Sequence, residues 1–269
     1  KEENAVEIKM EDENGEIYKN ALFIGLADLN GDGYLDLIMP CIDKEISMVL
    51  WGGPDGFSMK NKQVFRVHHA SGHKVADLNG DGYPELILAC HNPTSGRPWD
   101  SFIHIYWGGP EGFSETRRTQ LPCCCVNSMN IADFNNDGLP DLAIAARAKL
   151  DETRKRYSFI YFNGPDGFSQ ERRITLETTH ASSVSAIGDA VLFGQCANGL
   201  NYTNDALLFS FREGKLDPLP KRFEGEDMRR VSIFKNPDGK RHIFLLNHYS
   251  RRAVGFDKTY VYWGSKDGY

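Results

Sequence analysis

The sequence predicts an all-β fold made of repeated four-stranded antiparallel sheets, and three observations support this prediction. Two phrases recur along the chain: an acidic loop phrase, ADLNGDGY from Ala27, and a turn phrase, WGGPDGFS from Trp51. Glycine is abundant, with 26 residues, as short strands joined by tight turns require. No segment has a helical hydrophobic period of useful length. A unit of about 50 residues with four short strands is typical of a β-propeller blade, and a solenoid is the structural alternative.

Both phrases are repeated at similar intervals. The acidic loop phrase begins at Ala27, Ala76 and Ala132, and the turn phrase begins at Trp51, Trp107, Phe162 and, in truncated form, Trp263. Two weaker copies of the loop phrase follow. VSAIGDAVLF over 184–193 aligns if the loop between its two strands is deleted, and IFKNPDGKRHIFL over 233–245 keeps the loop length.

Five repeats therefore fill the chain as one domain. Their expected boundaries are 17–67, 68–120, 121–176, 177–224 and 225–269, with a closing strand in 1–16. No apolar run reaches the roughly 18 residues that a membrane helix needs. With a formal net charge of -6, nucleic acid is not an expected partner.

The first repeat shows the strands expected in each unit. Strands are predicted over 21–27, 35–40, 46–51 and 57–67. The acidic loop joins the first two strands and the Gly-Pro-Asp-Gly turn joins the last two, so both turns lie at the same end of the sheet.

The acidic loops have the residue pattern of a calcium site. Oxygen side chains stand at positions 1, 3, 5 and 9, position 7 offers its backbone carbonyl, and glycine at position 6 allows a sharp turn. Ca²⁺ takes six to eight oxygen ligands, and crowded carboxylates would repel one another without a cation. The sequence thus predicts three Ca²⁺ sites, with ligands Asp28, Asn30, Asp32, Tyr34 and Asp36; Asp77, Asn79, Asp81, Tyr83 and Glu85; and Asp133, Asn135, Asp137, Leu139 and Asp141.

An EF-hand-type loop begins in the same way but needs an acid at position 12 and flanking helices. Position 12 is Met39, Leu88 or Ile144 here, so that alternative is excluded three times. An acidic turn without metal is the simpler alternative. The fourth and fifth repeats should not bind calcium, because the loop is deleted at Gly188 and Phe234 and His242 replace two oxygen ligands.

These residues resemble the FG-GAP (VCBS-type) repeats, which form the blades of the integrin α-subunit propeller and of many secreted bacterial proteins. The resemblance covers nearly the whole chain and depends on DxNxDGxxD followed by an apolar strand and WGGPDGFS. It implies a propeller with calcium in hairpin loops on one face and ligand binding elsewhere. Family members are mostly seven-bladed, and five repeats are visible here.

The first strand-like segment, AVEIKM over 5–10, resembles a fourth strand, and the last repeat stops where its fourth strand should begin. This strand is expected to close the ring. It could instead complete a neighbouring molecule in a head-to-tail fibre, or the chain could be a piece of a seven-bladed protein.

The strand ends opposite the acidic loops collect basic and aromatic residues. They suit an anionic polysaccharide or a protein partner, and solvated loops are the simpler explanation of such residues. The candidate ligand-binding residues are His91, Arg97, Trp99, Arg147, Arg154, His248, Tyr249 and Arg251.

We therefore expect an extracellular or cell-surface module for adhesion, carbohydrate binding or assembly, because such loops fill at extracellular calcium levels. The sequence has no GxSxG, HExxH, P-loop or GxGxxG motif, which argues against an enzyme. The enzyme alternative is a polysaccharide lyase with His248, Tyr249 and Arg251 as its acid, base and charge-stabilising groups.

Overall fold

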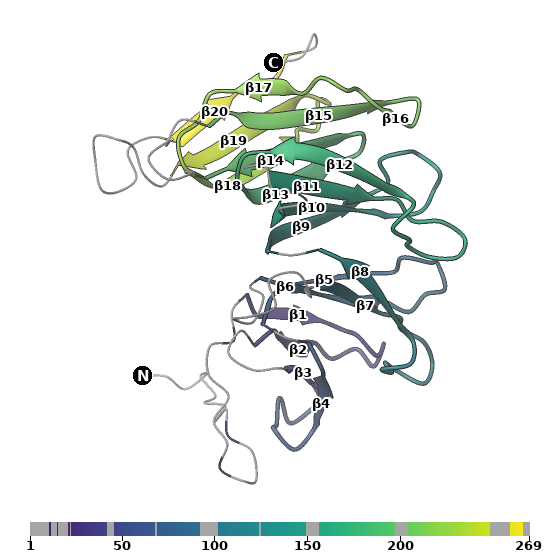
Figure 1. Cartoon of the computed structure of the whole chain (residues 1–269). Helices are drawn as coiled ribbons and strands as arrows, with labels where there is room; N and C mark the ends of the chain where they lie inside the picture. The colour runs from purple at the N-terminus through teal and green to yellow at the C-terminus, as the bar shows by residue number, and fades with distance from the viewer. Residues whose placement is uncertain are drawn as a thin grey trace. The chain divides into compact units, whose positions relative to one another are not determined.

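The computed structural model describes residues 11, 15, 21, 23–41, 46–67, 69–91, 102–123, 125–148, 156–196, 204–247 and 259–265. All regular elements among them are β-strands (Figure 1). Within this part of the chain, no helix has the length and apolar character needed to cross a membrane. The chain divides into two compact units, Lys1–Pro122 and Cys123–Tyr269, which are described separately.

The first unit contains two four-stranded antiparallel sheets in which neighbouring strands are consecutive in sequence. The first sheet contains β1 (Gly25–Ala27), β2 (Asp36–Met39), β3 (Ser47–Leu50) and β4 (Lys62–Phe65), and the second contains β5 (Ala70–Ala76), β6 (Glu85–Cys90), β7 (Phe102–Tyr106) and β8 (Arg118–Pro122).

The second unit contains three antiparallel sheets. The first contains β9 (Val126–Ala132), β10 (Asp141–Ala148), β11 (Arg156–Tyr161) and β12 (Arg173–Thr178). The next contains β13 (Ala181–Ile187), β14 (Ala190–Gln195), β15 (Ala206–Arg212), β16 (Lys215–Leu216) and β17 (Lys221–Phe223). The last contains β18 (Met228–Lys235), β19 (Arg241–Asn247) and β20 (Thr259–Tyr262).

The all-β, antiparallel prediction is confirmed. The five sheets follow one another in the order of the expected repeats, although β8 ends at Pro122 and β12 at Thr178, two residues beyond the boundaries at 120 and 176. The fourth strand of the first repeat is shorter than expected, because β4 begins only at Lys62. Two turns occupy the residues before it: Gly56 N–H donates to the Gly53 carbonyl at 2.9 Å, and Asn61 N–H donates to the Ser58 carbonyl at 3.0 Å. The glycine-rich segment thus forms turns where a longer strand was predicted.

The two weaker repeats also form the expected hairpins. β13 and β14 pair from Ile187 opposite Ala190, so only Gly188 and Asp189 join them. β18 and β19 pair with Phe234 opposite His242. The closing strand expected in 1–16 and its exchange between molecules fall outside the described residues, so ring closure and the single-domain boundaries stay predictions.

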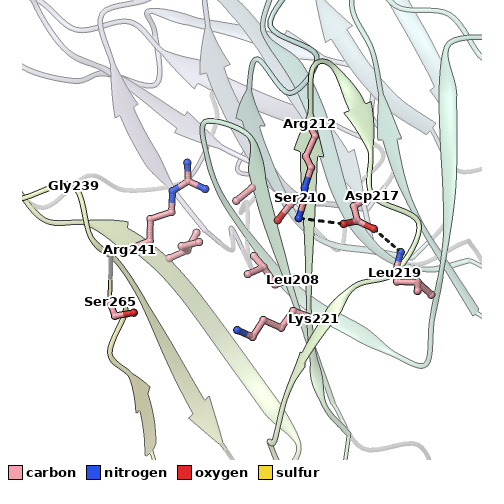
Figure 2. Close-up of a pocket in the computed structure, with 11 residues that line it drawn as sticks. Leu208, Ser210, Arg212, Asp217, Leu219, Lys221, Gly239, Arg241 and Ser265 are labelled. Carbon is pink, nitrogen blue, oxygen red and sulfur yellow. Dashed lines mark hydrogen bonds and ion pairs between the residues drawn. The ribbon is translucent and has the colours of Figure 1, made fainter. Parts of the chain in front are cut away.

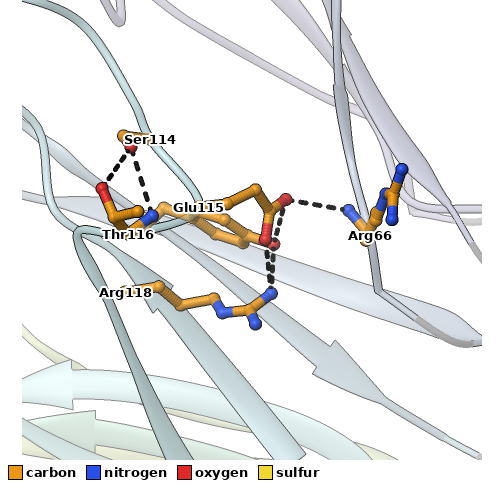
Figure 3. A network of polar contacts seen from close by, with 6 residues as sticks. Arg66, Ser114, Glu115, Thr116 and Arg118 are labelled. Atoms are coloured by element: carbon orange, nitrogen blue, oxygen red, sulfur yellow. Dashed lines mark hydrogen bonds and ion pairs between the residues drawn. The ribbon is translucent and has the colours of Figure 1, made fainter.

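The core of the first unit lies between its two sheets. Phe65 from β4 and Tyr106 from β7 pack edge to face with ring centroids 4.8 Å apart, and both are almost fully buried. A network of polar contacts involves the hydroxyl group of Tyr106 (Figure 3). Glu115 accepts a hydrogen bond from Arg66 N–H at 3.2 Å and forms an ion pair with Arg118 at 2.7 Å. Glu115, which directly follows the turn phrase of the second repeat, thereby holds the end of the first sheet.

The core of the second unit is built by the inner strands. Strand β14 is buried at all six positions, whereas the outer strand β12 alternates between buried and less buried residues. Val191 and Phe193 of β14 pack in one cluster with β10 residues, while Ala190 and Leu192 pack in a second with Ile233. Buried on both faces, β14 separates two apolar layers.

Candidate functional site

The acidic loops begin where the first strands of three sheets end. Loop 1 is 28–36, loop 2 is 77–85 and loop 3 is 133–141. In loop 1 the Asp28 carboxylate accepts hydrogen bonds from Gly31 N–H at 2.8 Å and Gly33 N–H at 3.0 Å. Loop 2 repeats this arrangement at 2.7 Å and 3.0 Å around Asp77. The position-1 carboxylate therefore draws the chain into a tight turn around itself.

Positions 3 and 5 interlock within each loop. Asn30 Oδ1 accepts a hydrogen bond from Asp32 N–H at 3.0 Å, and Asn30 Nδ2 donates to Asp32 Oδ2 at 3.0 Å. Asp32 Oδ1 in turn accepts from Tyr34 N–H at 2.8 Å. The same three bonds occur in loops 2 and 3, with lengths between 2.7 and 3.0 Å. Side-chain oxygens thus gather on one short exposed turn.

Position 6 requires glycine because its backbone is left-handed. Gly33, Gly82 and Gly138 have φ values of 86°, 86° and 92°, a region that L-residues with a Cβ rarely adopt. The sequence-based role of these glycines is therefore confirmed.

The acids at position 9 differ from the others because they are fully buried. Asp36 Oδ2 accepts a hydrogen bond from Leu29 N–H in its own loop at 2.8 Å. Its Oδ1 accepts one from Gly52 N–H, in the turn phrase, at 2.8 Å. Glu85 bridges Leu78 N–H (2.6 Å) and Gly108 N–H (3.3 Å) in the same way. Each acid therefore ties the acidic loop to the turn phrase of its own repeat.

Asp141 completes the pattern in loop 3 by accepting from Phe134 N–H and Asn163 N–H, both at 2.9 Å. The sequence reading assigned these acids only as ligands and missed this bridging role. It also missed position 2, where Leu29, Leu78 and Phe134 are buried. The apolar residue between two polar positions in all three loops was the available signal.

The buried acids carry an electrostatic cost. Burial raises the pKa of Glu85 to about 7, with Asp81 and Asp77 adding to the rise and the two backbone donors opposing it. Burial likewise raises the pKa of Asp141 to about 6, and it raises the pKa of Asp36. Removing a carboxylate from water disfavours its ionised form, and neighbouring carboxylates disfavour it further. A cation in these loops would offset both effects.

The donor chemistry of the loops fits a hard divalent cation. Among the described residues, no Lys, Arg or His forms an ion pair with any acid of the three loops. The same part of the chain contains no group of three or more His, Cys, Asp or Glu side chains arranged to hold a metal ion. A Ca²⁺ ion bound in these loops would take amide and backbone carbonyl oxygens beside the carboxylates, and Ca²⁺ accepts such ligands readily.

Most of the predicted ligand face lies outside the described residues. This applies to Arg97, Trp99, Arg154, His248, Tyr249 and Arg251, and to the side chain of Arg147 in β10. His91 directly follows β6, and its backbone N–H donates to the His69 carbonyl at 3.1 Å. The ligand face and the lyase alternative therefore stay predictions.

Comparison with known families agrees with the loop geometry. A family model described as an FG-GAP-like repeat matches residues 28–88 and 77–144. Residues 28–144 therefore contain FG-GAP-like repeats. Each match begins at the position-1 aspartate of an acidic loop, and together the two matches include all three loops. No match was found among curated proteins.

Solved structures with a similar fold are β-propeller-like. BBS1N in complex with ARL6DN, soaked with lead, aligns with a TM-score of 0.53 and 11% identity over 93% of this chain. This chain spans 66% of that chain, just under two thirds of its length. At this identity the likeness concerns the fold alone, and it supports a propeller-type architecture.

Two further structures align less well. The same BBS1N complex soaked with mercury has a TM-score of 0.39 and 10% identity, with 90% of this chain and 83% of that chain covered. The biofilm matrix protein Bap1 of V. cholerae has a TM-score of 0.33 and 15% identity, with 94% of this chain and 52% of that one covered.

Proposed function

We propose that this FG-GAP-repeat protein binds three Ca²⁺ ions and acts as an extracellular binding or assembly module. The observation that carries the proposal is the threefold repetition of one donor geometry. Positions 1, 3 and 5 make the same type of internal hydrogen bonds in each loop, and no described cation pairs with the loop acids.

The loop residues have separate tasks in this proposal. The side chains at positions 1, 3 and 5 and the backbone carbonyls of Tyr34, Tyr83 and Leu139 would supply most of the ligand oxygens. The buried carboxylate at position 9 can also take part, because an ionised carboxylate that accepts two hydrogen bonds keeps further lone pairs. Bound Ca²⁺ would supply positive charge that offsets the repulsion among these acids.

The proposed location follows from the calcium chemistry of the loops. The proposed ligand follows from the basic and aromatic residues at the opposite strand ends. Extracellular calcium modules work at about 10⁻⁴–10⁻³ M, a range in which solvent-exposed loops of this kind suffice. The expected ligand is an anionic polysaccharide or a protein. A protein ligand has one structural parallel, since the BBS1N chain of similar fold was solved in complex with another protein, ARL6DN.

Thermal melting of the whole chain with single-loop variants tests the calcium proposal. Ca²⁺ at 100 times its dissociation constant should stabilise the fold by about 2.7 kcal/mol per site, and EDTA should remove this effect. Asp32→Ala, Asp81→Ala and Asp137→Ala should each reduce the calcium-dependent rise in Tm by about one third.

Asp55→Ala is the matched control, because Asp55 is an exposed acid in a turn outside the loops. It should leave the calcium-dependent rise unchanged. A Tm that is the same in EDTA and in excess Ca²⁺ would contradict the proposal, as would equal effects of Asp55→Ala and Asp32→Ala.

A further inference from the structure

A pocket of about 440 Å³ lies in the second unit between the sheet of β14, β15 and β17 and the hairpin of β18 and β19 (Figure 2). Its volume falls within the usual range for small-molecule sites, about 300–1,000 Å³. None of the residues predicted to bind calcium or a ligand lines it. The pocket is therefore a feature that the proposed calcium function does not explain.

The inner wall of the pocket is apolar. Ala190, Leu208 and Ile233 line it, and all three are buried members of one hydrophobic cluster. An apolar wall favours a ligand with an aromatic or aliphatic body, because contact with the wall removes apolar surface from water.

The rim of the pocket is rich in cations. Arg212, Lys221 and Arg241 line it, whereas Asp217 is the only acid among its described lining residues. Figure 2 shows Lys221 extending from β17 toward the side of the pocket that β19 and Ser265 form. Cationic side chains above an apolar wall are complementary to a ligand that joins an anionic group to an apolar body.

Each of the two pocket arginines forms an ion pair with an acid. Arg212 pairs with Asp217 at 3.9 Å, with its side chain 83% exposed. Arg241 pairs with Asp189, which lies in the two-residue turn between β13 and β14. An anionic ligand would compete with Asp189 for the Arg241 guanidinium, so this acid should limit the affinity of the pocket.

The position of the pocket in the repeats explains why it is open. The turn 188–189 and the turn 236–240 are the places where the first three repeats carry their acidic loops. In the fourth repeat the nine-residue loop is replaced by two residues, so no long turn extends beyond the ends of β13 and β14. Gly239, Arg241 and Ala190 from these two hairpins all line the pocket.

We propose that this pocket binds an organic anion, in which a carboxylate or sulfonate group is joined to an apolar body. Lys221 and Arg241 hold the anionic group, and the wall formed by Leu208 and Ile233 holds the apolar body. Binding requires no calcium, so it is independent of the proposed function of the acidic loops.

Fluorescence titration with 8-anilinonaphthalene-1-sulfonate, an aromatic sulfonate, tests the proposal on the whole chain in EDTA. We expect saturable binding at one site per chain that weakens as NaCl is added. Lys221→Met should weaken binding about tenfold, the effect of losing one charge-assisted contact. Lys215→Met, an exposed lysine on β16 that does not line the pocket, should leave binding unchanged.

A variant that is expected to tighten binding distinguishes a specific effect on the pocket from loss of folding. Asp189→Asn should tighten binding about two- to fivefold, because it releases Arg241 from its ion pair. The neutral analogue N-phenyl-1-naphthylamine should bind more weakly than the sulfonate. The proposal is overturned by absence of saturable binding, by equal binding of the two probes, or by equal effects of Lys221→Met and Lys215→Met.

Discussion

The first three repeats and the last two differ in how the first two strands of each sheet are joined. In the first three, a nine-residue acidic loop joins the first two strands, and a buried acid ties it to the next turn. In the fourth repeat, two residues close the same hairpin. Hairpin closure therefore does not require the acids. The proposed bound cation would account for their charge, whereas the two-residue turn of the fourth repeat leaves room for a cationic pocket.

The largest expected effect comes from the buried acid of loop 2. Glu85→Ala leaves the N–H groups of Leu78 and Gly108 without their acceptor, and a buried donor without a partner costs about 1–3 kcal/mol. We expect a loss of about 2–5 kcal/mol in the free energy of unfolding, measured by urea denaturation in EDTA.

Asp81→Ala in the same loop is the control, because Asp81 is exposed. In EDTA it should cost less than about 1 kcal/mol. Equal losses for the two variants would show that the position-9 acid has no special structural role, and the comparison between the two kinds of hairpin would then fail.

A smaller effect is expected where the fourth repeat contacts loop 3. Gly214 has φ 72°, and a Cβ there would lie 2.6 Å from the Asn135 carbonyl oxygen. Gly214→Ala should therefore cost about 2–3 kcal/mol by urea denaturation, from backbone strain and the clash together.

Gly239→Ala separates the two causes. Gly239 has φ 86°, but its nearest neighbour to an added Cβ is Lys235 Cε at 3.8 Å. This variant should show the strain alone, about 1 kcal/mol. A loss as large as that of Gly214→Ala would mean that contact with loop 3 contributes nothing.

The smallest effect is expected in the fifth repeat. Asp238 lies in the turn between β18 and β19 and pairs with Lys240 at 2.9 Å. Because a cation already neutralises it, Asp238→Ala should not change the calcium-dependent rise in Tm, whereas Asp137→Ala should. A measurable calcium effect of Asp238→Ala would remove the distinction between the two groups of repeats.

Local sequence patterns predicted the hairpins well. The turn at Gly188 and Asp189 and the left-handed glycines of the acidic loops depend only on residues close in the chain, and both were predicted. The bridge from Asp36 to Gly52 N–H was not predicted, because it spans 16 residues and depends on the register of β2 and β3.

The pocket was not predictable for a similar reason. Lys221 and Arg241 lie on different sheets, and their meeting point depends on how those sheets pack. For the fourth and fifth repeats, the sequence pattern predicted only that calcium ligands are missing, and it predicted no pocket. The ligand face opposite the loops is still a prediction, because most of its residues lie outside the described part of the chain.

The most direct test of the central claim is the stoichiometry of calcium binding, measured by equilibrium dialysis of the metal-free chain against radioactive Ca²⁺. Three equivalents per chain are expected from the three acidic loops, with two for Asp32→Ala and three for Asp55→Ala. The account would be contradicted if the chain bound no calcium at high free Ca²⁺, or if Asp32→Ala left the number of bound ions unchanged.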